Sequence, residues 1–193
     1  MLRGMLADVL ATPVHEGVVL RDVPGNRLLT ELGFNLSAGE ITAARLNGWL
    51  KDHGYPMPRL TFAQLDGYLK GYIDLVFEAA GRYYILDWKS NHLGYAREDY
   101  AEDRLALAMQ EHGYHLQYLL YTAALHRYLG RRLADYDYER DFGGVLYLFV
   151  RGVRPGWTDA AGRALGTWFH RPAAAAIASL DALLAGSAAA IAT

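Results

Sequence analysis

The sequence contains no cysteine among its 193 residues. This absence excludes disulfide bonds, metal centres held by cysteine, and a cysteine nucleophile. The chain also lacks an excess of basic charge, because 19 Lys and Arg residues face 21 Asp and Glu residues. A protein that finds DNA unaided usually has such an excess, so we expect that any nucleic acid must be delivered to this chain by another component.

Long hydrophobic runs are missing as well. No stretch approaches the roughly 18 apolar residues of a membrane span, and the first residues do not resemble a secretory signal. The alanine-rich residues 173–192 are interrupted by polar residues and glycine, which predicts one or two helices. With 52% hydrophobic and 21% charged residues, we expect a globular protein that forms a single domain over residues 1–193, and the absence of cysteine is compatible with the cytosol.

The apolar pattern predicts an α/β (α+β) fold with a central mixed sheet flanked by helices. Alternation predicts a strand over residues 28–36, and Ser37 followed by Glu40 is typical of a helix cap, so a helix to residue 50 is expected. Residues 68–78 and 82–89 predict a hairpin that turns at 79–81. Further helices are predicted over residues 2–10, 98–110 and 114–129, with a fully buried strand over 145–150.

Charged residues in the predicted hairpin are the first candidates for chemistry. Asp74 interrupts an apolar strand, and Asp87 and Lys89 are two residues apart on the next strand, so both project to one face. If the strands are antiparallel neighbours, Asp74 comes close to Asp87. Two carboxylates beside an ammonium group form a site for a hard cation such as Mg²⁺ or Mn²⁺.

Two structural explanations compete with this metal site. Asp87 and Lys89 could simply end a strand at its solvated edge. Asp74 is harder to explain in that way, because an ionised carboxylate within apolar sequence needs a partner, although a buried ion pair with Lys89 would supply one. The spacing alone leaves these alternatives open.

A second group of polar residues lies in the helix predicted over residues 114–129. Tyr114, Gln117 and Tyr121 are spaced to share one helix face, and spacing alone favours aromatic packing against the sheet as the explanation. His112, His115 and His126 do not form the pattern of a helical zinc site. Glycine-rich phosphate loops, dinucleotide fingerprints and hydrolase elbows are missing from the sequence.

Four segments in order carry a resemblance to a known family, namely GYIDLVFE, YYILDWKSN, YHLQYLLYTAALHRYL and FGGVLYLFVRG. The series resembles the C-terminal nuclease domain found in the RecB family of RecBCD-type helicase–nucleases (exodeoxyribonuclease V), which belongs to the PD-(D/E)XK superfamily. It covers most of the chain, from about Glu31 to the last predicted helix. The D-x-K motif alone is weak, but its combination with the upstream Asp and the Q-x-x-x-Y motif is specific.

The resemblance implies an activity and the residues that perform it. It implies a metal-dependent exodeoxyribonuclease that cuts phosphodiester bonds in double-strand break repair and DNA degradation. The cofactor implied is Mg²⁺, with Mn²⁺ or Ca²⁺ able to occupy the same site. The implied metal ligands are Asp74, Asp87 and the Trp88 backbone carbonyl, and Lys89 is the implied catalytic lysine. Glu31 matches an acidic active-site position.

The same resemblance assigns supporting residues and partners. Gln117 and Tyr121 correspond to the Q-x-x-x-Y element, which supports the site and DNA, and Tyr114 is a weaker candidate there. DNA, the helicase portion of the same polypeptide, and RecC- and RecD-like subunits are the implied partners.

The sequence departs from the family in one respect. The family has a metal-binding histidine on a helix well upstream of the first strand, and the present sequence starts after that position; His15 is not assigned this role. The helicase portion is missing too. We therefore expect the chain on its own to be weakly active or inactive. The alternative is a nuclease fold that serves as a non-catalytic module for DNA or protein binding, whereas relatives with a four-cysteine iron–sulfur cluster are disfavoured by the absence of cysteine.

Overall fold

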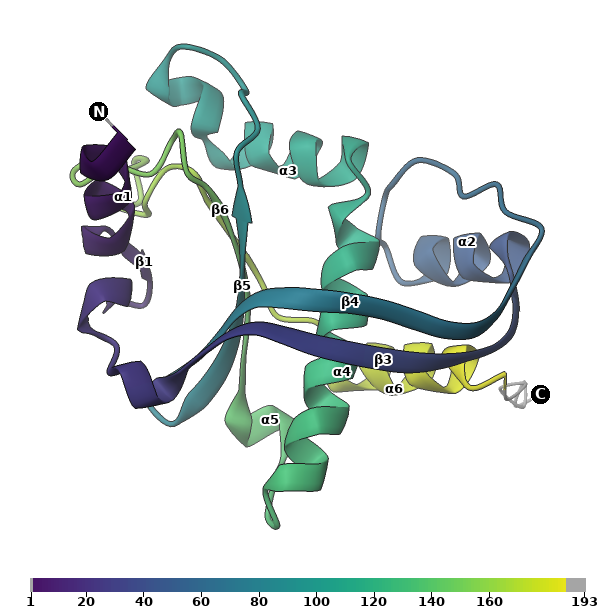
Figure 1. Ribbon diagram of the computed structural model, residues 1–193. Coiled ribbons are helices and arrows are strands. Elements are labelled where there is room, and N and C mark those ends of the chain that lie inside the picture. The colour runs from purple at the N-terminus through teal and green to yellow at the C-terminus, as the bar shows by residue number, and fades with distance from the viewer. Residues whose placement is uncertain (1, 187–193) are drawn as a thin grey trace. The chain divides into compact units, whose positions relative to one another are not determined.

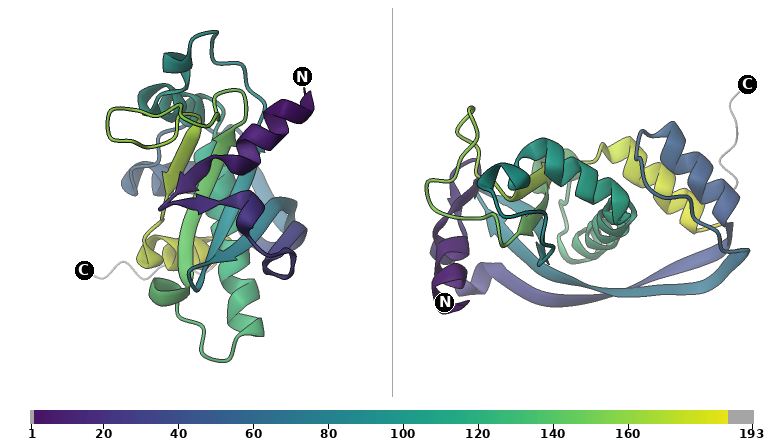
Figure 2. Two further views of the ribbon diagram at one scale, coloured as in Figure 1. Left: turned by 90° about the vertical axis from the view of Figure 1, so that its left-hand side faces the viewer. Right: turned by 90° about the horizontal axis from the view of Figure 1, so that it is seen from above.

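The structure is a computed structural model that describes residues 2–186. These described residues form six α-helices and seven strands, whose arrangement is shown in Figure 1 and Figure 2. The helices are α1 (Leu2–Ala11), α2 (Ala43–Asp52), α3 (Glu102–Glu111), α4 (Tyr114–Arg132), α5 (Tyr138–Asp141) and α6 (Ala174–Leu184). The strands are β1 (Pro13–His15), β2 (Val18–Val19), β3 (Leu28–Thr42), β4 (Gln64–Ala79), β5 (Arg82–Lys89), β6 (Phe142–Phe149) and β7 (Thr167–His170). No helix within the described residues is long and apolar enough to cross a membrane.

Five strands form one sheet in the order β3-β4-β5-β6-β7. Strand β4 pairs antiparallel with β5, β5 pairs parallel with β6, and β6 pairs antiparallel with β7. A parallel pair needs a long crossover, and the segment with α3, α4 and α5 supplies it between β5 and β6. The predicted α/β class with a mixed central sheet is therefore confirmed.

The chain forms two compact units. Among the described residues, the first consists of residues 2–32, 73–108 and 141–171, and the second of residues 33–72, 109–140 and 172–186. Strands β3 and β4 contribute residues to both units.

In the first unit, β5 and β6 are covered on both faces. All eight residues of β6 are buried, as the continuous apolar run from Val145 predicts. The hydrophobic core behind them is formed by side chains from α1, β1, the segments that follow β2 and β6, and the sheet: Val9, Val14, Leu20, Leu75, Phe77, Tyr84, Leu86, Leu146, Leu148 and Val153. Asp87 points to the opposite face of β5 from this core and is also buried, at 2% exposure.

In the second unit, two glycines make room for aromatic rings between β3 and β4. The Tyr72 ring lies over Gly33, where a Cβ atom would be 3.3 Å from the ring, and the Phe34 ring lies over Gly71, where the distance would be 2.7 Å. The Phe34 ring meets Tyr121 of α4 edge to face at 5.6 Å between centroids. These ring-over-glycine contacts favour a single register for the two long strands.

Polar contacts join the helices of the second unit. Trp49 of α2 donates its indole hydrogen to the Ser179 hydroxyl of α6 at 3.0 Å. Arg127 of α4 pairs with Asp181 of α6 at 2.6 Å. Helix α6 is therefore tied to two other helices of its unit by side chains that the helical pattern alone did not single out.

Several predicted boundaries are wrong. The helix capped by Ser37 does not form: the alternation of burial continues through Leu36 and Ala38, and β3 extends to Thr42. The cap of α2 is Thr42, whose hydroxyl accepts a hydrogen bond from the Arg45 amide at 3.3 Å. Helix α4 continues through Gly130, where the sequence predicted its end, to Arg132. The short strands β1, β2 and β7 were not predicted, and residues 187–192 of the predicted alanine-rich tail lie outside the described residues.

Candidate active site

Strands β4 and β5 place Asp74 next to the backbone of Trp88. Their antiparallel register runs from Ala79 opposite Arg82 to Leu75 opposite Leu86. Just beyond this ladder, the Trp88 amide donates a hydrogen bond to Oδ2 of Asp74 at 3.0 Å. The hydrogen bond joins a side-chain oxygen of β4 to a backbone amide of β5 at the candidate site. It orients the Asp74 carboxylate.

Asp87 and Lys89 form a buried ion pair on β5. Nζ of Lys89 lies 2.5 Å from Oδ2 of Asp87, and the two side chains are 11% and 3% exposed. Below the ammonium group lies the Tyr147 ring of β6, with its centroid 4.9 Å away, and Tyr147 is the register partner of Asp87. The low exposure rules out the solvated strand edge as the explanation of this motif.

The environment of Asp87 works against its ionisation. Burial raises the pKa of this carboxyl group, the hydrogen bond and positive charge of Lys89 lower it, and the negative charge of Asp74 raises it again. The balance is a raised pKa. A carboxylate whose charge is this poorly compensated is a candidate for a functional role, because a bound cation would supply the missing positive charge.

The oxygen atoms at this position suit a hard cation. Oδ2 of Asp87 is buried and lacks a regular hydrogen bond, despite its contact with Lys89. Mg²⁺ prefers carboxylate and carbonyl oxygens and keeps several waters, so it needs few protein ligands. Asp74, Asp87 and the Trp88 carbonyl fit that donor set. Within residues 2–186, no three His, Asp or Glu side chains gather around a common point.

The Q-x-x-x-Y residues lie on α4 in the second unit. Gln117 donates its side-chain amide to the Tyr121 hydroxyl at 2.9 Å, as one turn of helix allows. Tyr121 is buried and Gln117 and Tyr114 are half-buried. Leu119 and Ala123 belong to the core as predicted, whereas Leu116 and Leu120 are half-buried. The contact with Phe34 shows that Tyr121 packs against the β3 part of this unit, and the roles of Gln117, Tyr121 and Tyr114 toward DNA stay predictions.

Glu31 occupies an unusual backbone position. It lies within β3, its side chain is exposed, and its φ angle is +52°. Such a value is rare for a residue other than glycine and is often found at functional sites. The unusual backbone is consistent with the acidic role that the resemblance implies for Glu31, which also stays a prediction.

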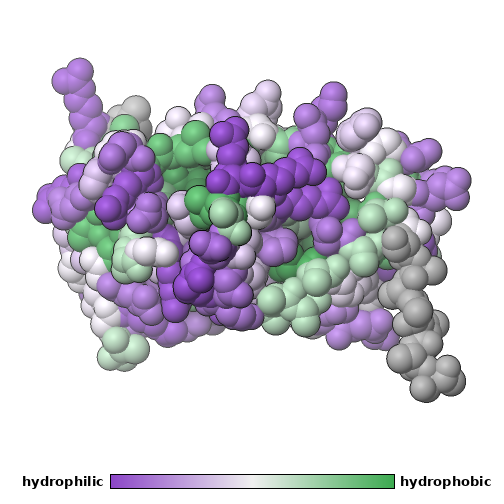
Figure 3. All heavy atoms as spheres, turned by 90° about the horizontal axis from the view of Figure 1, so that it is seen from below, coloured by the Kyte–Doolittle hydropathy of each residue, from purple (hydrophilic) through white to green (hydrophobic). Residues whose placement is uncertain are grey.

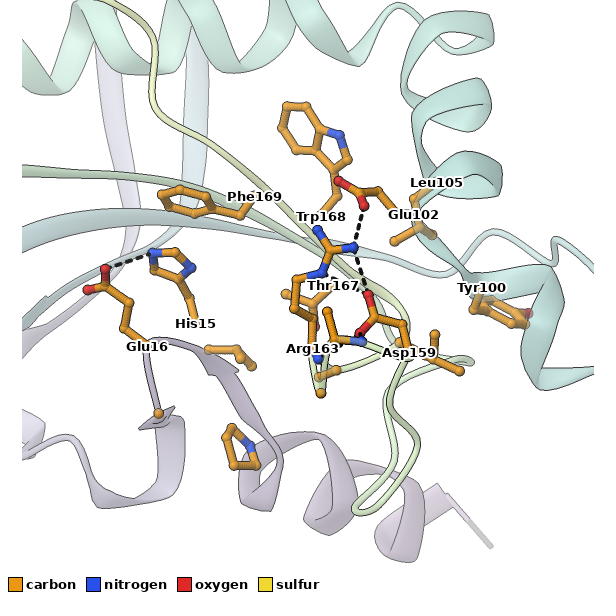
Figure 4. A pocket seen from close by; sticks show the side chains of 17 residues that line it. His15, Glu16, Tyr100, Glu102, Leu105, Asp159, Arg163, Thr167, Trp168 and Phe169 are labelled. Carbon is orange, nitrogen blue, oxygen red and sulfur yellow. Dashed lines mark hydrogen bonds and ion pairs between the residues drawn. The ribbon is translucent and has the colours of Figure 1, made fainter.

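A second cluster of charges in the first unit has a different character (Figure 4). Arg163 lies between two carboxylates, at 2.6 Å from Glu102 and 2.7 Å from Asp159, in the wall of a cavity of about 400 Å³. On the opposite side of that cavity, His15 stacks on Phe169 with 3.6 Å between ring centroids. The side chains of Arg163 and Glu102 are 61% and 66% exposed, so water already solvates their charges, and this cluster is a weaker candidate for cation chemistry than the buried Asp87 beside Asp74.

Sequence reasoning did not single out Tyr147. The residue sits in a run of apolar residues and has no motif of its own. Its position under Lys89 follows from the parallel register of β5 and β6, which pairs Asp87 with Tyr147 and Lys89 with Phe149. A positive charge over an aromatic face is favourable, so Tyr147 helps to hold the ammonium group in place.

Comparisons with known proteins agree with the geometry. Residues 18–155 match the family model described as the PD-(D/E)XK nuclease superfamily. The chain is 44% identical over 192 residues to the RecBCD enzyme subunit RecB of Escherichia coli (strain K12), which covers 96% of this chain and 16% of that protein. It is 39% identical over 184 residues to the RecB subunit of Haemophilus influenzae, covering 93% of this chain and 15% of the relative.

A third relative is the RecB subunit of Mycobacterium tuberculosis (strain CDC 1551 / Oshkosh), with 46% identity over 122 residues, 62% of this chain and 11% of the relative. The chain thus spans about a sixth of the length of the first two relatives. The family match extends over the whole β4–β5 hairpin, in which Asp74, Asp87 and Lys89 lie. With its mixed sheet, its buried D-x-K motif and this match over more than half of its length, the chain belongs to the PD-(D/E)XK nuclease superfamily.

Proposed function

We propose that this chain is the nuclease unit of a RecBCD-type helicase–nuclease and cleaves DNA phosphodiester bonds with Mg²⁺. The observation that carries the proposal is the buried pair of Asp87 and Lys89, 2.5 Å apart on β5, beside Asp74, whose carboxylate accepts a hydrogen bond from the Trp88 amide. The similarity to RecB subunits supports the reaction class, and the exonuclease V type of activity is part of the proposal.

The metal supplies a Lewis acid that polarises the phosphate and lowers the pKa of a bound water. Asp74 and Asp87 would hold it together with the Trp88 carbonyl, while Mn²⁺ or Ca²⁺ could occupy the same oxygen ligands. The hydrogen bond from the Trp88 amide keeps the Asp74 carboxylate oriented before any ligand arrives. Packing on both faces of β5 does the same for Asp87.

Lys89 would bind a non-bridging oxygen of the scissile phosphate and orient the attacking water. Its ammonium group is held between Asp87 and the Tyr147 ring, so little reorganisation is needed when the phosphate becomes more negative in the transition state. Glu31 would add a further carboxylate, and Gln117, Tyr121 and Tyr114 would support the site and the DNA. The partners proposed are DNA, a helicase portion and RecC- and RecD-like subunits in the bacterial cytoplasm.

A non-catalytic DNA- or protein-binding module is the second candidate. One observation favours it: residues 2–186 contain no cluster of three His, Asp or Glu side chains, and fewer protein ligands hold Mg²⁺ more weakly. The two candidates differ in one measurable respect, which is hydrolysis that depends on both the cation and Asp87.

The test is digestion of single- and double-stranded DNA with Mg²⁺ or Mn²⁺ and with EDTA, accompanied by calorimetric titration of the cation. We expect slow, metal-dependent cleavage that Asp87→Asn abolishes, together with loss of cation binding. Asp66→Asn is the matched control, because Asp66 is an exposed residue of β4. Cleavage that survives Asp87→Asn, or cation binding without any cleavage in a protein that includes the helicase portion, would contradict the proposal.

A further inference from the structure

A cavity of about 910 Å³ opens in the first unit immediately beyond Lys89. It is lined by the segment after β5, the segment after β6, and α1, including Asp8, Ser90, His92, Tyr95, Arg151 and Arg154. Strands β5 and β6 are parallel, so their carboxyl ends meet at one edge of the sheet, and the Val150 amide donates a hydrogen bond to the Lys89 carbonyl at 3.0 Å. Ligands of such sheets typically bind at this edge.

The charge of the cavity lining is predominantly positive. Nε of Arg151 donates to the Ser90 carbonyl at 2.9 Å, which places this exposed guanidinium one residue after the candidate catalytic lysine. Nη1 of Arg154 donates to the Val150 and Val153 carbonyls at 3.1 and 2.7 Å, and Nε lies 3.8 Å from the carboxylate of Asp8. Asp8 offsets one arginine, so one net positive charge remains beside Ser90 for an anionic ligand.

Aromatic side chains form the other half of the lining. Tyr95 is 99% exposed and meets the His92 ring edge to face at 4.6 Å between centroids. Trp157 is half-buried, and Tyr100 lies buried below, where its hydroxyl accepts a hydrogen bond from the Leu93 amide at 3.4 Å. The Tyr95 ring therefore stands in solvent on a segment that Tyr100 anchors, with an arginine of the same cavity available for a phosphate.

We propose that this cavity binds nucleotides of a single-stranded DNA next to the phosphate to be cleaved, with a base stacked on Tyr95 and a backbone phosphate paired with Arg151. This inference rests on the proposed nuclease function and adds to it a subsite in which Tyr95 and Arg151 position the strand. Stacking on an exposed ring beside an arginine is the usual way in which proteins bind single strands. Bases within a duplex are already stacked and paired, so they are poor partners for Tyr95.

The experiment measures binding without catalysis. Fluorescence anisotropy with a labelled oligothymidylate of about 15 nucleotides in EDTA compares the 193-residue chain with Tyr95→Ala and Arg151→Ala. The matched controls are Tyr68→Ala and Arg131→Ala, which remove an exposed tyrosine and an exposed arginine that do not line the cavity. A duplex of the same length is the second ligand, and thermal unfolding confirms that each variant is folded.

We expect Tyr95→Ala to weaken single-strand binding by about five-fold or more, as the loss of one stacked base does. Arg151→Ala should reduce the slope of log K against log salt by about 0.7, which corresponds to one phosphate contact on a single strand. Tyr95→Trp should retain binding, because it keeps a stacking surface, and the controls and the duplex affinity should change little.

Wild-type affinity in both cavity variants, no detectable single-strand binding by the wild type, or equal losses in the controls would each overturn the inference. Its failure is separable from that of the nuclease proposal, because binding is measured without metal. If cleavage depends on Asp87 but single-strand binding is unchanged in the Tyr95 and Arg151 variants, only the proposed subsite is refuted. If single-strand binding depends on Tyr95 and Arg151 but DNA is never cleaved, only the proposed nuclease function is refuted.

Discussion

Two charged clusters in the first unit have nearly the same contact distances and very different surroundings. Lys89 and Asp87 approach to 2.5 Å with side chains 11% and 3% exposed, whereas Arg163 and Glu102 approach to 2.6 Å with side chains 61% and 66% exposed. Burial raises the pKa of Asp87, while hydrogen bonds from the Arg163 and Ala161 backbone and from the Arg163 side chain lower the pKa of Asp159. Distance alone therefore does not distinguish the two ion pairs, whereas their burial and the direction of the carboxyl pKa shift do.

Replacing Lys89 is the most direct test of the difference between the two clusters. Lys89→Ala should leave the fold intact and reduce DNA cleavage by about 10²–10³-fold, the usual loss when one group that stabilises transition-state charge is removed. Initial rates with Mg²⁺, in a protein that includes the helicase portion, provide the measurement. Lys70→Ala is the control, since Lys70 is exposed on β4. Near-normal turnover by the Lys89 variant would show that the buried pair is structural.

Packing behind the buried pair gives the next largest effect. Ile85 is fully buried and lies two residues before Asp87, so Ile85→Val should lower the free energy of unfolding by about 0.5–1.5 kcal/mol. Leu29→Val on β3 is the control, because Leu29 is 40% exposed and should change stability little. Urea denaturation measures both. Equal effects would mean that the surroundings of Asp87 are no more tightly packed than the exposed strand.

The two clusters should respond to pH in opposite directions. The raised pKa of Asp87 means that its ionisation opposes folding, so the stabilising difference between wild type and Asp87→Asn should decrease as pH rises from the usual carboxyl pKa through the raised one. The lowered pKa of Asp159 means the reverse: the advantage of wild type over Asp159→Asn should be present above the usual pKa and disappear as pH falls through the lowered one. Denaturation at several pH values, without metal, measures how the free energy of unfolding of each variant differs from that of the wild type. If both differences change with pH in the same direction, the contrast between the clusters is wrong.

The smallest effect is expected at Arg163. Exposed ion pairs contribute little, because solvent and salt screen them, so Arg163→Ala should leave the unfolding midpoint unchanged within the scatter of the measurement. The same titration in low and high salt shows whether any residual contribution is electrostatic. A clear loss of stability would mean that this exposed cluster contributes to folding, as a buried ion pair can.

The sequence predicted the buried parts of this fold better than its exposed parts. Strand β5 has the predicted bounds, Arg82–Lys89, because an apolar run between a glycine turn and polar residues leaves few alternatives. The end of β3 was mispredicted, because Ser37 and Glu40 satisfy the pattern of a helix cap while the strand simply continues with one face exposed. Local sequence preferences for a helix cap do not determine the structure where tertiary contacts extend a strand through the same residues.

The candidate site was predictable to the same extent. Period-2 alternation put Asp87 and Lys89 on one face, and their contact follows from it. The burial of Asp87, the ring of Tyr147 and the hydrogen bond from the Trp88 amide could not be predicted, since each depends on strand pairing that the spacing of residues does not encode. For the same reason the roles of Glu31, Gln117 and Tyr121 stay predictions.

The hydrogen bond between the Trp88 amide and Asp74 has a consequence for the denticity of the site. Oδ2 of Asp74 accepts this hydrogen bond and Oδ2 of Asp87 is shared with Lys89, so we expect each carboxylate to bind a cation through a single oxygen. Two monodentate carboxylates fill only a small part of the octahedron that Mg²⁺ requires. A DNA phosphate that completes the shell would tighten cation binding, and by reciprocity the cation would tighten DNA binding. Occupancy of the site by the cation would then depend on bound DNA: low without DNA and high with it.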